Sequence, residues 1–190
     1  ALDEILGDLT PEFVKACVAD ASTLKGVSRP VDWLRLREAA AGGLIAPLVE
    51  KRILLGKDRV GFYEAVQEFR VAEVDGQLVG CGALHVMWED LGEERTLAVD
   101  DAWRHRRVGH ALLHQLEADA RELGLSRLFC LTFETEFFGR HGFEQISEGI
   151  VSPDVYAELV RSPDEGVAEF LDLARVKPNT LGNTRMLKRL

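Results

Sequence analysis

A run of basic residues between a predicted strand and a predicted helix is the part of this sequence best suited to chemistry. Residues 97–113, LAVDDAWRHRRVGHALL, predict a strand, a loop that carries Arg104, Arg106 and Arg107, and a helix that begins near Gly109. The first N–H groups of a helix have no partner within it and carry a partial positive charge, so they hold phosphate groups well. The segment therefore predicts a site for an anionic ligand such as a pyrophosphate, the alternative being a solvated basic loop.

Composition limits the classes of protein that this chain can represent. With 190 residues, of which 46% are hydrophobic, it can bury one substantial core. A formal net charge of −9 disfavours binding to nucleic acid or to a membrane surface. No apolar run approaches the ~20 residues of a membrane span, and the N-terminus has no signal-peptide pattern. We therefore expect a cytoplasmic protein.

The cysteines and histidines do not predict a disulfide framework or a metal site. Cys17, Cys81 and Cys130 are odd in number and widely spaced, and no ligand cluster accompanies the five histidines. Cys81 and Cys130 fall in apolar strand segments, so we expect both thiols in the core. We expect no metal.

The chain divides into an N-terminal extension over residues 1–30, predicted to be helical, and one domain over 31–190. Asp75-Gly76 is a hairpin signal, and Ser152-Pro153 and Ser162-Pro163 each predict an N-cap and first residue of a short helix. Strands are predicted over 31–38, 69–74, 77–87, 93–100, 127–133 and 184–190 and from Gly142-Phe143, and helices over 42–56, 58–70, 108–123 and 134–141. The fold class is α/β (α+β), with a mixed, largely antiparallel sheet flanked by helices.

Residues 31–190 resemble the GNAT acetyltransferase superfamily in their order of elements. In the superfamily's phosphate signature, Q/R-x-x-G-x-G/A, Arg104 and Gly109 match the two ends, and Arg107 stands where a glycine is usual. A register from Arg106 through Gly109 to Ala111 also matches. Five ordered segments further resemble the short stand-alone bacterial N-acetylglutamate synthases: KRILLGKDRVGFYEAVQEF, VGCGALHV, LGEERTLAV, LFCLTFETEFFGRHGF and VKPNTLGNTRML.

The resemblance implies transfer of acetyl from acetyl-CoA to the α-amine of L-glutamate, the first step of arginine biosynthesis. Two alternatives stay open at this point. One is a GNAT enzyme that acts on another amine, such as glutamine, another amino acid or a protein N-terminus. The other is a non-catalytic acetyl-CoA-binding regulatory module. The resemblance implies that the binding partner is a small-molecule substrate, L-glutamate or L-glutamine. A homodimer would also be compatible with the superfamily.

The same resemblance assigns the catalytic and cofactor-binding positions. The amine must lose a proton, and Glu93 is the candidate base, either directly or through a water; an ordinary charged strand entrance is the alternative. The N–H of Leu97 is the candidate donor to the thioester oxygen. Phe138 replaces the tyrosine that often acts as general acid, and a thiol can leave as thiolate without one. The cofactor-binding residues implied are Leu97, Ala98, Val99, Arg104, His105, Arg106, Arg107, Val108, Gly109 and His110.

Glutamate would bring two carboxylates to an acidic protein, so the site needs local cations. Lys57 matches a basic position of the family, and Lys177 and Arg185 lie in a polar C-terminal segment. Taken singly, each could instead be a solvated surface residue. The implied substrate-binding residues are Leu55, Lys57, Thr96, Lys177, Asn179, Asn183, Thr184 and Arg185.

Overall fold

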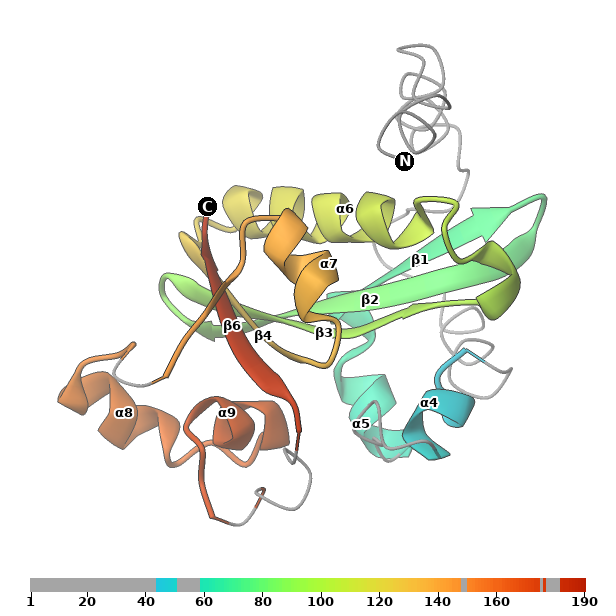
Figure 1. Cartoon of the computed structure of the whole chain (residues 1–190). Helices are drawn as coiled ribbons and strands as arrows, with labels where there is room; N and C mark the ends of the chain where they lie inside the picture. Colours follow the sequence, from blue (N-terminus) through green and yellow to red (C-terminus); the bar gives the residue numbers. More distant parts are fainter. Residues whose placement is uncertain (1–43, 51–58, 148–149, 175, 177–181) are drawn as a thin grey trace.

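A six-stranded sheet with the order β1-β2-β3-β4-β6-β5 is the centre of the molecule (Figure 1). The computed structural model describes residues 44–50, 59–147, 150–174, 176 and 182–190. The strands are β1 (Phe69–Val74), β2 (Gln77–Trp88), β3 (Leu91–Val99), β4 (Arg127–Thr132), β5 (Glu144–Gln145) and β6 (Thr184–Arg189). Only β3 and β4 run parallel, and every other neighbouring pair is antiparallel. The predicted mixed, largely antiparallel sheet is confirmed.

Helices cover both faces of this sheet. Figure 1 shows α6 and α7 on one face, and α4, α5, α8 and α9 on the other. Their bounds are α4 (Ala46–Glu50), α5 (Arg59–Glu64), α6 (Val108–Glu122), α7 (Thr135–Arg140), α8 (Pro153–Leu159) and α9 (Glu165–Phe170). We call these the α6 face and the α9 face.

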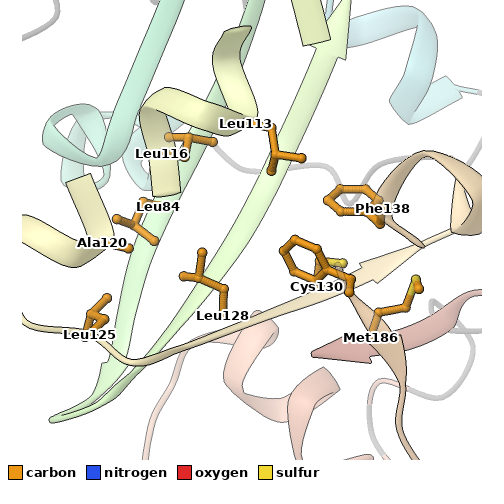
Figure 2. Close-up of a cluster of buried hydrophobic side chains, with 10 residues drawn as sticks. Leu84, Leu113, Leu116, Ala120, Leu125, Leu128, Cys130, Phe138 and Met186 are labelled. Atoms are coloured by element: carbon orange, nitrogen blue, oxygen red, sulfur yellow. The ribbon is translucent and has the colours of Figure 1, made fainter. Parts of the chain in front are cut away.

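The α6 face holds a tightly packed apolar core (Figure 2). Leu113, Leu116 and Ala120 of α6 are completely buried there. Their apolar neighbours in this cluster come from the sheet and from the segments beside α7 and β4: Leu84, Leu125, Leu128, Cys130, Phe138, Phe143 and Met186. Glycines in β2 allow the close approach of α6, because a Cβ added at Gly80 would lie 3.0 Å from both Leu112 and Val108. Because Gly80 has no side chain, α6 packs directly against the backbone of β2 at this position.

Local signals placed most elements correctly. Asp75 and Gly76 have φ of 51° and 80°, which confirms the two-residue hairpin turn. The predicted helix 108–123 is α6, and Gly124 follows it with φ of 83°. Cys81 and Cys130 are buried as predicted, and burial raises the pKa of both thiols, that of Cys81 to about 12.

Three boundaries differ from the sequence predictions. The predicted helix 58–70 ends with α5 at Glu64, and a 3₁₀ turn leads into β1, because residues from Phe69 onward pair with β2. The strand predicted from Gly142-Phe143 is only the two residues of β5. Ser152 caps α8 as predicted, but the N-cap of α9 is Asp164 rather than Ser162. The Asp164 carboxylate accepts from Val167 N at 3.0 Å, whereas the Ser162 hydroxyl accepts from the Asp164 N–H.

The predicted extension 1–30, the strand 31–38 and most of the helix 42–56 lie outside the described residues. Within the described ranges, no helix has the length and apolar character needed to cross a membrane. The same residues contain no group of three or more His, Cys, Asp or Glu side chains placed to hold a metal ion.

Candidate active site

The site is built where β3 and β4 separate. The parallel pairing of these two strands runs from Leu91–Arg127 to Glu93–Phe129. Beyond Glu93, β3 continues along β2, while β4 continues along β6. The unpaired halves of β3 and β4 therefore form a split in the sheet, and the predicted cofactor-binding residues Ala98 and Val99 lie on its β3 side.

A β-bulge in β3 lies at this split. Cys81 pairs with Ala98 and Ala83 pairs with Arg95, so Gly82 alone faces both Thr96 and Leu97. Thr96 has φ of +58°, which is strained for a β-branched residue, and the Cys81 thiol donates to its carbonyl at 3.7 Å. A bulge redirects the main-chain groups beside it, in keeping with a donor role for the Leu97 N–H. That role stays a prediction.

The basic loop lies at the end of the split. Residues 104–107 are exposed, and α6 begins at Val108, with its first intrahelical bond from Ala111 N to Arg107 O at 3.0 Å. A Cβ at Gly109 would lie 3.6 Å from both Phe137 of α7 and Val99 of β3, so the start of α6 adjoins the tip of β3. Exposed arginines and free helix N–H groups fit the pyrophosphate of CoA.

The three loop arginines are held in different ways. Arg104 forms an ion pair with Asp101 at 2.8 Å, and the Arg106 guanidinium lies over the Trp103 ring at 5.0 Å. Arg107, at the position where the superfamily signature has glycine, has φ of +65°. The side chain of His110, in the first turn of α6, contacts His141 and Phe137.

The left-handed conformation of Arg107 leads to a stability prediction. The conformation costs a non-glycine residue about 1 kcal/mol or more, so Arg107→Gly should raise the free energy of unfolding by roughly that amount while weakening acetyl-CoA binding. Arg106→Gly removes the same charge from an exposed neighbour whose φ is not positive, and it should lower stability. Chemical denaturation of both variants tests this. An equal loss of stability in both would contradict it.

Glu93 and Glu94 are adjacent in sequence but lie on opposite faces of the sheet. Glu94 lies on the α6 face, where its charged neighbours are Glu117 and Lys188, and burial raises its pKa well above the ordinary value. Glu93 lies on the α9 face and is 4% exposed. Burial also raises the pKa of Glu93, and the nearby positive charge of Arg95 opposes that rise. Glu93 therefore shares its face of the sheet with α9, and Glu94 shares its face with α6.

An arginine that sequence reasoning missed holds the Glu93 carboxylate. Arg95 Nη2 lies 2.6 Å from Glu93 Oε2, and the same guanidinium donates to both oxygens of Asp164 at 3.0 and 3.2 Å. Burial alone would raise the pKa of Asp164, but the hydrogen bonds and charge of Arg95 hold it at about 2. Arg95 and Asp164 thus join β3 to the start of α9.

The first turn of α9 covers Glu93 directly. A Cβ added at Gly166 would overlap Glu93 Oε2 and would lie 3.0 Å from Oε1. On the other side, His85 of β2 is the cross-strand neighbour of Glu93, and its Nδ1 lies 2.6 Å from Glu68 Oε1. His85 therefore occupies the strand face, with its imidazole held by a carboxylate.

Glu169 of α9 adds a carboxylate to this region and gives a pH prediction. Burial, and then the charges of Glu93 and Glu165, raise its pKa from 4.5 to about 7. Because the folded state keeps this proton where the unfolded state releases it, stability that is present below pH 4.5 is lost as the pH rises through about 7. Glu169→Gln should match the wild type at pH 4.5 and exceed it by roughly 2–3 kcal/mol at pH 8. Denaturation at both pH values, with the exposed Glu144→Gln as control, tests this; a difference independent of pH would contradict it.

The predicted substrate-binding residues are only partly brought together within the described residues. Thr96 lies in the bulge, three positions after Glu93. Arg185 of β6 reaches α9, where its guanidinium donates to the Phe170 carbonyl, and it lies 6.0 Å from the Phe170 ring. Thr184 pairs with Thr132 at the end of β4, and Asn183 directly precedes β6. Leu55, Lys57, Lys177 and Asn179 lie outside the described residues.

Phe138 is a core residue. It is 5% exposed and packs against Phe143 with the ring centroids 5.1 Å apart. At this position the chain has no hydroxyl that could protonate a leaving group.

Comparisons with known proteins agree with this fold. Residues 46–143 match the model of the acetyltransferase (GNAT) family. The amino-acid acetyltransferase of Mycobacterium tuberculosis is 59% identical over 139 residues, which cover 72% of this chain and 80% of that protein. The amino-acid acetyltransferase of Pseudomonas fluorescens is 39% identical over 57% of this chain, but the match spans only 27% of that longer protein.

Solved structures give the same picture. A Mycobacterium tuberculosis protein in complex with CoA and NLQ is 54% identical, with a TM-score of 0.74 over 80% of this chain and 95% of that one. N-acetylglutamate synthase from Neisseria gonorrhoeae, complexed with coenzyme A and N-acetyl-glutamate, is 28% identical, with a TM-score of 0.63 over 87% of this chain and 34% of that one.

The chain belongs to the GNAT acetyltransferase family. With relatives that are amino-acid acetyltransferases, it is an acetyl-CoA-dependent amino-acid N-acetyltransferase.

Proposed function

We propose that the protein acetylates the α-amine of L-glutamate, giving N-acetylglutamate, the first step of arginine biosynthesis. The observation that carries the proposal is the position of Glu93, a buried carboxylate at the last paired position before β3 and β4 separate. The similarity to an N-acetylglutamate synthase complexed with its product supports the choice of acceptor.

The proposed cofactor contacts come from the start of α6, the basic loop and the end of β3. The N–H groups at the start of α6 and the arginines of the loop 104–107 would hold the pyrophosphate. The main chain of Ala98 and Val99 would pair with the pantetheine arm along the open edge of β3. The Leu97 N–H would stabilise the negative charge that develops on the thioester oxygen, an effect worth roughly 3–4 kcal/mol per donor.

The proton of the amine goes to Glu93. Because the carboxylate is 4% exposed, we propose that a water bridges it to the amine. Its raised pKa makes it a better base than an ordinary glutamate, provided that it is ionised when the amine arrives. The amine then attacks the thioester carbon, and the sulfur departs as thiolate, which needs no acid from Phe138.

The acceptor would be held by its carboxylates. Lys57, Lys177 and Arg185 are the cations proposed for this role in a chain of net charge −9, with Asn179, Asn183 and Thr184 as hydrogen-bonding partners. Main-chain groups at Leu55 and Thr96 complete the proposed set.

A panel assay tests the function. The release of CoA thiol is measured with acetyl-CoA and each free amino acid, including glutamate, glutamine and aspartate, and the products are identified by mass spectrometry. The proposal predicts the highest kcat/KM for glutamate. A higher kcat/KM for glutamine would overturn the choice of acceptor. Silence across the panel, with acetyl-CoA still bound, would overturn the amino-acid acceptor altogether.

A further inference from the structure

One guanidinium on the α9 face serves several carboxylates. Arg95 contacts Glu93 at 2.6 Å and Asp164 at 3.0 Å, and its own side chain is only 9% exposed. Burial raises the pKa of Glu169, and the charges of Glu93 and Asp164 raise it further, whereas the charge of Arg95 lowers it. Glu169 therefore lies near the same group of charges. Among the described residues, Arg95 therefore makes the largest favourable charge contribution to the Glu93 carboxylate, ahead of that of His85.

We propose that Arg95, anchored by Asp164, is a positioning residue that keeps the Glu93 carboxylate ionised and directed toward the acceptor. The inference rests on the proposed role of Glu93 as base. A base must be ionised before it can accept a proton, and burial works against ionisation. Arg95 supplies the opposite charge on the same strand face two residues away, where alternation of side chains brings the two together.

Asp164 sets how strongly Arg95 can act on Glu93. It binds the guanidinium through two hydrogen bonds, and it also accepts from the Val167 N–H as the N-cap of α9. The cap therefore fixes Arg95 and the first turn of α9 together, with Gly166 packed on Glu93. Asp164 also places a negative charge near Glu93, which opposes the ionisation that Arg95 favours.

These opposing charges predict shifts of opposite sign. Arg95→Met removes the positive charge and should move the ionisation of Glu93 to higher pH by about one unit or more. Asp164→Asn removes the negative charge but keeps a good N-cap, and it should move the ionisation to lower pH. Arg95→Lys keeps the charge and should remain near the wild type. The other charged groups near Glu93 are His85 of β2, with Glu68 behind it, and Glu169 of α9, and all three variants retain them.

The test is a titration of the Glu93 side-chain carbon by ¹³C NMR in the whole protein, with assignment by comparison to Glu93→Gln. It is paired with the pH profile of kcat/KM. The proposal is supported if the pKa of Glu93 rises in Arg95→Met and falls in Asp164→Asn, and if the acid limb of the kcat/KM profile shifts in the same directions. The activity that Arg95→Met loses at neutral pH should then return at higher pH.

Three results would overturn the proposal: shifts in the same direction, no shift, or a fall in activity equal at every pH. If Arg95→Met does not fold, the downward shift in Asp164→Asn decides. The NMR titration needs no activity, so the failure of the proposed acceptor in the panel assay, or of Glu93 as base, is distinguishable from the failure of this inference.

Discussion

Replacement of Glu93 by glutamine is expected to lower kcat by about 10²–10⁴-fold, the range that a positioned acid or base contributes. Glutamine has the shape of glutamate but cannot accept the proton of the amine. The affinity for CoA should not change, because the basic loop and the start of α6 are separate from this carboxylate. Steady-state kinetics with glutamate and calorimetric titration with CoA measure the two quantities.

The neighbouring residue offers a matched control. Glu94 is as buried as Glu93, but it lies on the α6 face, and burial raises its pKa well above the ordinary value. Because Glu94 lies on the opposite face of the sheet from the proposed base, Glu94→Gln should keep kcat within a few-fold of the wild type. Equal losses in the two variants would indicate damage to β3 rather than loss of a base. Unchanged turnover in Glu93→Gln would remove the base assignment.

Replacement of Arg70 by methionine is expected to lower the free energy of unfolding by about 3–5 kcal/mol. Arg70 of β1 and Asp119 of α6 form an ion pair at 2.7 Å, and their side chains are only 4% and 6% exposed. Removal of the arginine leaves a carboxylate in a region of low dielectric, and the hydrogen bond from Gln115 at 3.1 Å does not replace the lost positive charge. Chemical denaturation measures the loss.

Two further variants separate the buried charge from the loss of packing. The double variant Arg70→Met/Asp119→Leu removes both charges and should recover much of the lost stability. Arg140→Met breaks the Arg140–Glu136 pair, whose side chains are 74% and 87% exposed, and should change stability by roughly 0.5 kcal/mol or less. A double variant as unstable as Arg70→Met would contradict the electrostatic explanation.

The sequence predicted those parts of the fold that local patterns determine. The apolar spacing of α6 and the Asp75-Gly76 turn each depend on residues close in the chain, and both are as expected. The predicted N-cap of α9, Ser162, was wrong because Ser162 and Asp164 are both residue types that cap helices well. The choice between them is made by Arg95, which lies 69 residues away in the sequence and binds Asp164.

For the candidate site, the sequence predicted single positions on β3 and in the basic loop, because the family's motifs lie there. The bulge had no such signal, since Thr96 is a residue type that seldom adopts positive φ. The division of Glu93 and Glu94 between two faces follows from strand alternation once β3 is known. Arg95 shares the face of Glu93 for the same reason, and two-residue spacing from a candidate base was the signal that could have found it.

The order β4-β6-β5 has a consequence for the kinetics of folding. β1, β2 and β3 are joined by successive hairpins, whereas β6 lies between β4 and β5, which both precede it in the sequence. The pairing of β6 with β4 brings Arg189 opposite Arg127. Such distant pairing requires the closure of a long loop, which slows folding. Because α9 lies in that loop and covers Glu93, the chain acquires its hairpins first and its complete catalytic face last. Refolding followed by fluorescence should therefore run ahead of the recovery of acetyl transfer.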